Sequence, residues 1–90
     1  MTYAFHSDAA EKILRELTPT EQAAVESVRR GLEDDPTPDH ARGLPDADAG
    51  STSYAIELLP EQTGGRGISV VYRHDRDLDA ALILWLIAGP

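Results

Sequence analysis

The sequence predicts a single α+β domain, residues 1–90, with an N-terminal strand, a helical hairpin and a three-stranded antiparallel meander that together form one sheet. Two observations predict this class. The first half places apolar residues at helical spacing around a Thr-Pro-Thr-Glu signal at residues 18–21. The second half contains apolar runs of strand length separated by turn residues. A chain of 90 residues suits one domain.

The chain begins with an expected strand, Thr2–His6, because Tyr3 and Phe5 stand two residues apart and share one face of an extended segment. A helix follows, with Ser7 as its N-cap. Its apolar residues recur every three or four positions and predict one buried stripe: Ala10, Ile13, Leu14 and Leu17.

Thr18 as N-cap, Pro19 at the first helical position and Glu21 at the third predict a capping box, so one helix ends and the next begins within a single turn. The second helix should end before Pro36, since the residue before proline disfavours helix. Its apolar face is Ala24, Val25, Val28 and Leu32. Residues 36–51 are rich in proline and predict a loop.

The remaining residues predict three strands joined by two turns: Thr52–Leu59, the flexible turn Pro60–Gly67, Ile68–Arg73, the charged turn His74–Asp79, and Ala80–Ala88. The last strand is apolar at every position. It is therefore expected to be buried on both faces or covered by a partner. Trp85 would have Ile83 and Ile87 as same-face neighbours, which predicts core packing or a buried interface.

Composition restricts the class of function. The 8 Lys and Arg against 16 Asp and Glu give a net charge of −8, so nucleic acid is not expected as a direct partner. The absence of cysteine excludes disulfides, thiolate metal sites and a cysteine nucleophile. Neither His6 nor His40 has further ligands at a recognisable spacing, so no metal and no cofactor is expected. With no secretory signal and no apolar run long enough for a membrane helix, a cytoplasmic protein is expected.

Several segments together resemble one family: TYAFH, DAAEKILREL, the longer helix ending in DDP, PTPDHARGL, a strand opening with Tyr54, ISVVYRHD and ALILWLIAG. This pattern resembles the RelE/ParE toxin superfamily of type II toxin–antitoxin systems over nearly the whole chain. The resemblance implies a small α+β toxin fold wrapped by an extended or helical antitoxin segment. In the mRNA interferase branch, basic residues line the concave face of the sheet and cut mRNA in the ribosomal A site. In the ParE branch those residues are missing and DNA gyrase is the target.

The sequence departs from the interferase pattern at its basic positions. Ser69 stands where the family's Tyr-Arg-Val-Val-Tyr strand has arginine, and Ala55 and Glu57 stand where another basic position is expected. The pattern also expects His, Arg or Tyr just after the last strand, where this sequence reads Gly89-Pro90. These departures predict a toxin-like protein that is degenerate in its catalytic residues.

A few residues still carry chemistry suited to RNA. The catalytic candidates are Arg73, His74 and Glu57, and the binding candidates are Arg42, Arg66 and Arg73. Each has a plainer interpretation: His74 as part of a solvated turn with local ion pairs, Glu57 as a solvent-facing carboxylate, and Arg66 as a solubilising turn residue between glycines.

Three hypotheses follow from these observations. In the first, the chain is a toxin-like component that acts mainly through protein–protein binding, without competent mRNA cleavage, and binds an antitoxin-like segment that carries basic residues. In the second, it is an active ribosome-dependent endoribonuclease whose site has been relocated to Arg66, Arg73 and His74. In the third, it is a homodimeric interaction domain without toxicity that hides the strand Ala80–Ala88 or a sheet edge.

Overall fold

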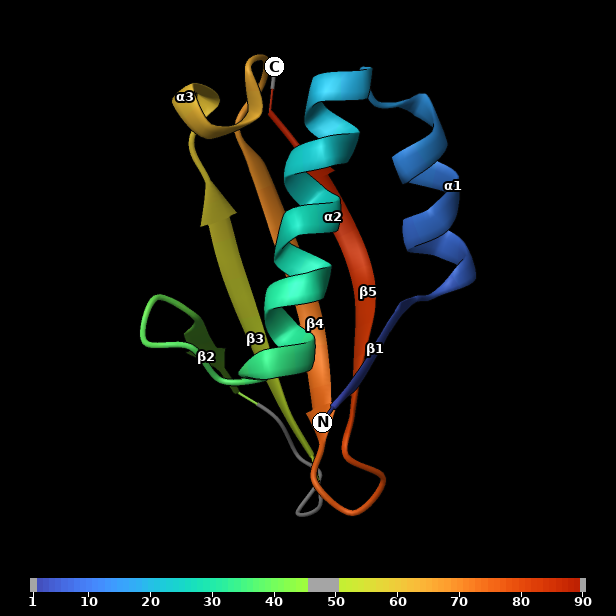
Figure 1. Cartoon of the computed structure of the whole chain (residues 1–90), viewed down its shortest axis with the longest axis vertical. Coiled ribbons are helices and arrows are strands. Elements are labelled where there is room, and N and C mark those ends of the chain that lie inside the picture. Colours follow the sequence, from blue (N-terminus) through green and yellow to red (C-terminus); the bar gives the residue numbers. More distant parts are fainter. Residues whose placement is uncertain (1, 46–50, 90) are drawn as a thin grey trace.

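The computed structural model describes residues 2–45 and 51–89 and shows one five-stranded sheet with two long helices packed on one face (Figure 1). The elements in chain order are β1 (Tyr3–His6), α1 (Asp8–Glu16), α2 (Pro19–Asp34), β2 (Arg42–Leu44), β3 (Ser51–Leu58), α3 (Pro60–Thr63), β4 (Ile68–Asp75) and β5 (Ala80–Ala88). The strand order is β1-β5-β4-β3-β2. β1 runs parallel to β5, and the other neighbours are antiparallel.

The predicted α+β class, the helical hairpin and the β3–β4–β5 meander are confirmed, but the layout differs in four details. Part of the expected loop 36–51 is strand β2, which pairs with β3; residues 46–50 of that loop lie outside the described residues. Part of the expected flexible turn is helix α3, which has Pro60 at its start and Gly64 at φ 70° at its end. β4 continues through His74 and Asp75, because both pair with β5. The parallel β1–β5 pairing makes the sheet mixed.

Both long helices begin as their sequences predict. The Ser7 hydroxyl accepts the Ala10 N–H at 3.1 Å and also donates to the Leu84 carbonyl at 2.8 Å, which ties the start of α1 to β5. The capping box of α2 is complete: Thr18 Oγ1 accepts the Glu21 N–H at 3.3 Å, and Glu21 Oε1 accepts the Thr18 N–H at 2.9 Å. These local bonds satisfy N–H groups that a helix start otherwise leaves unpaired.

The core lies between the helices and the inner face of the sheet. Its residues are Ala4, Ala10, Leu17, Val25, Leu32, Ile56, Leu58, Ile68, Val70, Tyr72, Ala81, Ile83 and Leu86. Tyr72 is fully buried and stacks on Tyr54, with 5.4 Å between ring centroids. Its hydroxyl donates to the Pro36 carbonyl at 2.7 Å, and the core thereby anchors the chain after α2.

A bulge between β4 and β5 changes which side chains of β5 face the core. The register shifts between Val71 and Tyr72, which lie opposite Trp85 and Ile83, so β5 contains one extra residue there. Ile83 is therefore buried, whereas Trp85 and Ile87 face away from the helices and are 53% and 59% exposed. Ile83 is therefore not a same-face neighbour of Trp85. Burial of β5 on both faces within the domain, and packing of Trp85 in the core, are wrong, because simple alternation does not survive the extra residue. The other expected alternative, cover of β5 and Trp85 by a partner, stays a prediction.

Candidate interaction surface on the outer face of the sheet

The outer face of the sheet is the face turned away from α1 and α2. Directly paired residues on neighbouring strands share a face, so the register shows which side chains occupy it. Those of β1 and β5 are Tyr3, Phe5, Leu82, Trp85 and Ile87; those of β4 are Ser69, Val71, Arg73 and Asp75; those of β3 and β2 are Ser53, Ala55, Glu57, Arg42 and Leu44. Ser69, Val71 and Arg73 thus share one face of β4, as alternation along a strand requires.

Four large apolar side chains of this face are strongly exposed, and we call them the apolar stripe: Tyr3, Phe5, Trp85 and Ile87. Their exposed fractions are 71%, 49%, 53% and 59%. All four come from the adjacent strands β1 and β5, where Phe5 lies beside Leu82. Soluble monomers rarely expose contiguous apolar surface of this kind unless it contacts a partner. The stripe is therefore the strongest indication of an interaction surface among the described residues.

Next to the stripe, three polar residues form a cluster around one carboxylate. Arg42 Nη2 lies 3.2 Å from Glu57 Oε1, and the Ser69 hydroxyl donates to Glu57 Oε2. Both oxygens of Glu57 are thus engaged by neighbouring strands, although the side chain is 52% exposed. Glu57 faces the outer surface as expected, but its hydrogen bonds to Arg42 and Ser69 oppose its use as a free general base.

Arg73 and His74 are consecutive residues of β4 and therefore point to opposite faces. Arg73 lies on the outer face, paired with Ser53 and Leu82. The His74 side chain is 12% exposed on the helix side, with Nε2 3.8 Å from Asp79 Oδ1. The expectation of a solvated turn at His74 is wrong, because the residue lies in β4 and its side chain is largely buried. The structure does not bring these two catalytic candidates together.

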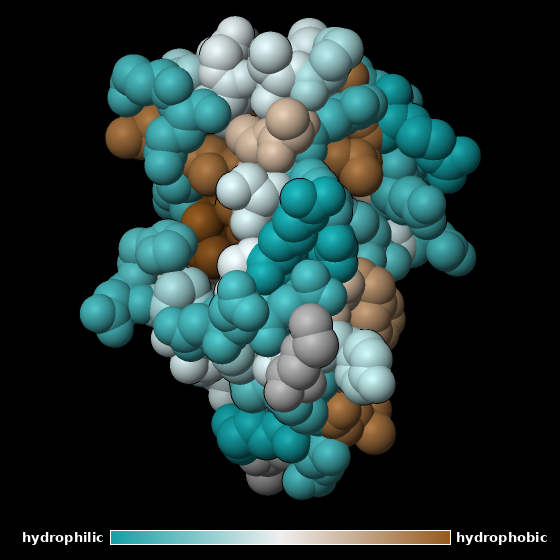
Figure 2. Space-filling model, viewed as in Figure 1, coloured by the Kyte–Doolittle hydropathy of each residue, from teal (hydrophilic) through white to brown (hydrophobic). Residues whose placement is uncertain are grey.

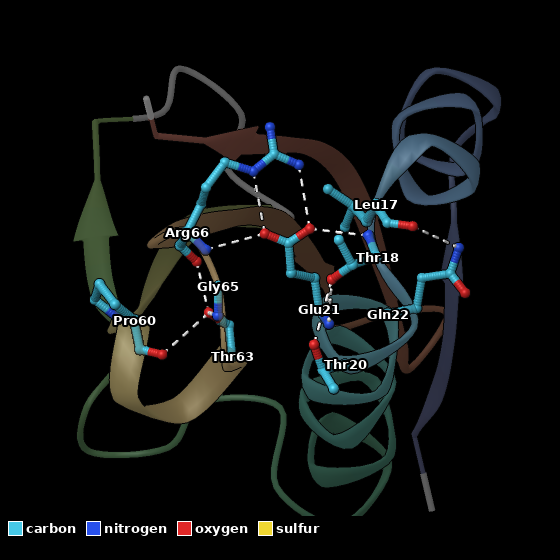
Figure 3. A network of polar contacts seen from close by, with 9 residues as sticks. All are labelled: Leu17, Thr18, Thr20, Glu21, Gln22, Pro60, Thr63, Gly65 and Arg66. Atoms are coloured by element: carbon cyan, nitrogen blue, oxygen red, sulfur yellow. Dashed lines mark hydrogen bonds and ion pairs between the residues drawn. The ribbon is translucent and has the colours of Figure 1, made fainter.

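Arg66 lies in the turn between α3 and β4 and binds the carboxylate of Glu21 at the start of α2 (Figure 3). Arg66 Nε and Nη2 donate to the two Glu21 oxygens, each at 3.1 Å, and the Arg66 backbone N–H donates at 3.0 Å. These bonds, with that from the Thr18 N–H, hold the pKa of the Glu21 carboxyl well below its usual range. Arg66, one of the expected binding residues, thus binds a carboxylate of the same chain and joins the α3–β4 turn to the start of α2.

Gly65 belongs to the same contact and was not singled out by the sequence. A Cβ on Gly65 would lie 2.8 Å from Glu21 Oε2. That carboxylate is buried and held by several hydrogen bonds, so a side chain at this position would have to displace it. The only sequence signal for this contact is the capping box, which occupies one carboxylate oxygen of Glu21 and leaves the other free to accept hydrogen bonds from a distant residue.

The charges of the outer face are few and balanced among the described residues: Arg42 and Arg73 against Glu57 and Asp75. The described residues contain no group of three His, Asp or Glu side chains placed to hold a metal ion. His6 lies on the helix side; burial lowers the pKa of its imidazole, and both ring nitrogens lack a hydrogen-bond partner. None of the described helices is long and apolar enough to cross a membrane.

This arrangement, one sheet with a helical hairpin on its inner face and an open outer face, is the RelE-like toxin fold, as the sequence resemblance implies. Three solved structures share it over almost the whole chain. They are the archaeal RelE–RelB complex from Pyrococcus horikoshii OT3 (TM-score 0.76, 21% identity, 98% of this chain and 96% of that chain), the intact E. coli RelBE toxin–antitoxin complex (0.73, 17%, 100% and 99%) and the RelBE2 toxin–antitoxin complex from Mycobacterium tuberculosis (0.67, 22%, 99% and 94%). No protein-family model and no curated protein matches the chain.

Proposed function

We propose that this chain is the toxin-like component of a toxin–antitoxin-type pair and acts through protein–protein binding, without competent mRNA cleavage. The observation that carries the proposal is the outer face: Ser69, Ala55 and Glu57 occupy positions where the interferase pattern expects basic groups, and β1 and β5 expose the apolar stripe on the same face. The three structurally similar proteins are all toxin–antitoxin complexes, which supports the toxin-like role.

The chemistry of RNA scission argues for binding over cleavage. Cutting RNA without a metal requires a base for the 2′-hydroxyl, a cation for the phosphate and an acid for the leaving oxygen. Glu57 is engaged by Arg42 and Ser69, and His74 lies on the other side of the sheet from Arg73. The endoribonuclease alternative therefore has a cation on the outer face but lacks a base and an acid placed beside it.

The expected partner is an antitoxin-like segment that combines apolar and basic residues. Its apolar residues would cover the apolar stripe and remove that surface from water. Its basic residues would complement a chain of net charge −8 and accelerate association through long-range attraction. A second candidate function, a homodimeric interaction domain, is favoured by the same stripe, because two copies could cover it mutually.

The test measures binding between this chain and the product of the adjacent reading frame. Trp85→Ala removes the largest side chain of the apolar stripe and should weaken binding by about tenfold or more. Leu78→Ala is the matched control, since Leu78 is 72% exposed but lies in the β4–β5 turn. Equal binding by both variants and the wild type would contradict the proposal. A concentration-dependent dimer that Trp85→Ala abolishes would instead establish the homodimer.

Growth of cells that express the chain alone tests the toxin-like part. The proposal expects growth arrest that co-expression of the partner relieves. The Arg73→Ala variant should arrest growth as the wild type does, because the arrest does not depend on RNA cleavage at the outer face. Normal growth without the partner would remove both the toxin-like role and the endoribonuclease alternative.

A further inference from the structure

We propose that a pocket at the α3 end of the outer face binds an arginine side chain of the protein partner. The guanidinium binds at Glu57 and Ser69. The aliphatic stem lies between Leu59 and Ile87. The inference deepens the proposed function, on which it rests for the existence of a partner. It names a residue type that the partner carries and the place where that residue binds.

The pocket is a hollow of about 330 Å³ at the end of the sheet where β3 leads into α3 and β5 ends (Figure 1). Glu57, Ser69 and Ile87 are directly paired across β3, β4 and β5, so their side chains stand in one row on the outer face. With neighbouring strands about 4.8 Å apart, this row places the backbones of Glu57 and Ile87 about 10 Å from one another. The other lining residues belong to strand ends and adjoining turns: Leu58, Leu59, Pro60, Gly67, Ile68 and Gly89.

The pocket adjoins the apolar stripe, because Ile87 belongs to both. Leu59 follows β3 and Ile87 lies on β5, and these strands flank β4 on its two sides. Both side chains are more than half exposed, at 55% and 59%, so the pocket has an uncovered apolar wall on each side. A partner that covers the stripe therefore reaches the mouth of the pocket at Ile87.

The carboxylate of Glu57 can accept a further donor while its present contacts remain. Arg42 reaches Oε1 from β2, on one side of β3, and the Ser69 hydroxyl donates to Oε2 from β4, on the other side. An ionised carboxylate offers about four acceptor positions, so these two contacts leave others open. Glu57 and Ser69 line the pocket and Arg42 does not. A group that enters the pocket therefore approaches the carboxylate from the Ser69 side.

The lining selects a cation, and its geometry favours arginine. Glu57 is the only charged residue among the described residues that line the pocket. A phosphate or a carboxylate would meet like charge there, whereas a cation is attracted by Glu57 and by the net charge of −8. Because Glu57 Oε2 and Ser69 Oγ are hydrogen-bonded neighbours, the planar fork of a guanidinium can engage both. The methylene groups of the same side chain can pack on Leu59 and Ile87.

A larger hollow, of about 430 Å³, lies beside α2 on the helix side, and Figure 2 shows apolar atoms at its floor. Its described lining contains neither a carboxylate nor a guanidinium. That hollow can bury apolar groups, but it offers no charged partner to a basic side chain. Of these two concave sites, the pocket at Glu57 is the one whose lining specifies a residue type.

The test titrates N-acetyl-arginine methylamide into the isotope-labelled chain and follows the backbone amide shifts. Saturable shifts are expected at Glu57, Ser69 and Ile87. The citrulline analogue has nearly the same shape but carries an uncharged urea group, and it should bind about fivefold or more weakly. Equal binding of the two compounds, or binding of neither, would overturn the proposal.

Two charge-matched variants test the carboxylate. Glu57→Gln and Glu61→Gln each remove one negative charge, and Glu61 is an exposed residue of α3 that does not line the pocket. Glu57→Gln should weaken binding of the arginine compound, and of the product of the adjacent reading frame, by about fivefold or more. Glu61→Gln should leave both affinities nearly unchanged. Equal losses in the two variants would assign the effect to net charge and overturn the proposal.

Two leucine variants test the position of the stem. Leu59→Ala removes one apolar wall and should weaken binding of the arginine compound by about threefold, whereas Leu78→Ala alters the β4–β5 turn and should not. Equal affinities of these two variants would contradict the assigned stem position. If the arginine compound does not bind while the partner complex still depends on Trp85, the pocket is rejected and the proposed function stands. If it binds as expected and no partner complex forms, the pocket stands and the proposed function fails.

Discussion

The bulge in β5 is testable with one chemical change made at two positions. Ile83→Ala and Ile87→Ala delete the same atoms from residues four apart on one strand. Simple alternation would place both side chains on the same face and predict similar costs. The structure instead places Ile83 in the core at 0% exposure and Ile87 on the outer face at 59% exposure.

The expected free-energy costs differ because only one site is enclosed. Removing a fully buried isoleucine to alanine costs about 2–5 kcal/mol, which combines lost burial with the cavity left behind. At Ile87 about two fifths of the side chain is covered. A fully buried carbon group contributes about 0.8 kcal/mol, and Ile→Ala deletes such groups from a side chain that is only two fifths covered, so Ile87→Ala should lower the free energy of unfolding by about 1 kcal/mol. The deletion opens to solvent and leaves no closed cavity.

Urea and thermal unfolding, followed by far-UV circular dichroism, measure this difference. In a domain of this size about 1 kcal/mol lowers the Tm by about 4–8 °C, so Ile83→Ala should lower it by at least about 8 °C and Ile87→Ala by no more than about 8 °C. Equal destabilisation by the two changes would refute the bulge, and with it the assignment of the apolar stripe to the outer face.

Three further changes test other contacts. Arg66→Met should lower the free energy of unfolding at neutral pH, because it removes the partner that depresses the folded-state pKa of Glu21. The stabilisation that Arg66 provides should shrink as pH falls below the carboxyl's ordinary pKa of 4.5, so the urea midpoints of the variant and the wild type should converge in acid. Tyr72→Phe removes the bond to the Pro36 carbonyl and should cost about 0.5–1.5 kcal/mol in urea unfolding, with unchanged circular dichroism. Ser7→Ala removes the α1 cap and should cost about 0.5–2 kcal/mol; no change in Tm would contradict the cap.

Local chemistry made the helices predictable from the sequence. The Ser7 cap and the Thr18–Glu21 capping box involve residues within three positions of one another, so their signals lie in a short window. The solvent-facing position of Glu57 was likewise predictable, because β3 alternates regularly and pairs with β4 without a shift over this residue.

Contacts between distant segments were not predictable in the same way. Arg66 reaches Glu21 across 45 residues, and neither residue shows this in its local pattern. β2 is a short strand that forms only by pairing with β3, so the local sequence favoured a loop there. Because β2 was not predicted, the contact of Arg42 with Glu57 across these two strands was not predicted either. The β5 bulge arises from the register of β5 with β4. Every residue of β5 is apolar, so the sequence shows no polar–apolar alternation whose interruption would have marked the bulge.

The most direct test of the account adds the purified chain, in excess, to ribosomes programmed with a defined mRNA and maps the transcript ends by primer extension. Intact mRNA is expected, because Glu57 is hydrogen-bonded to Ser69 and His74 lies on the other face of the sheet from Arg73. Codon-specific cuts that disappear with Arg73→Ala would contradict it and restore the endoribonuclease.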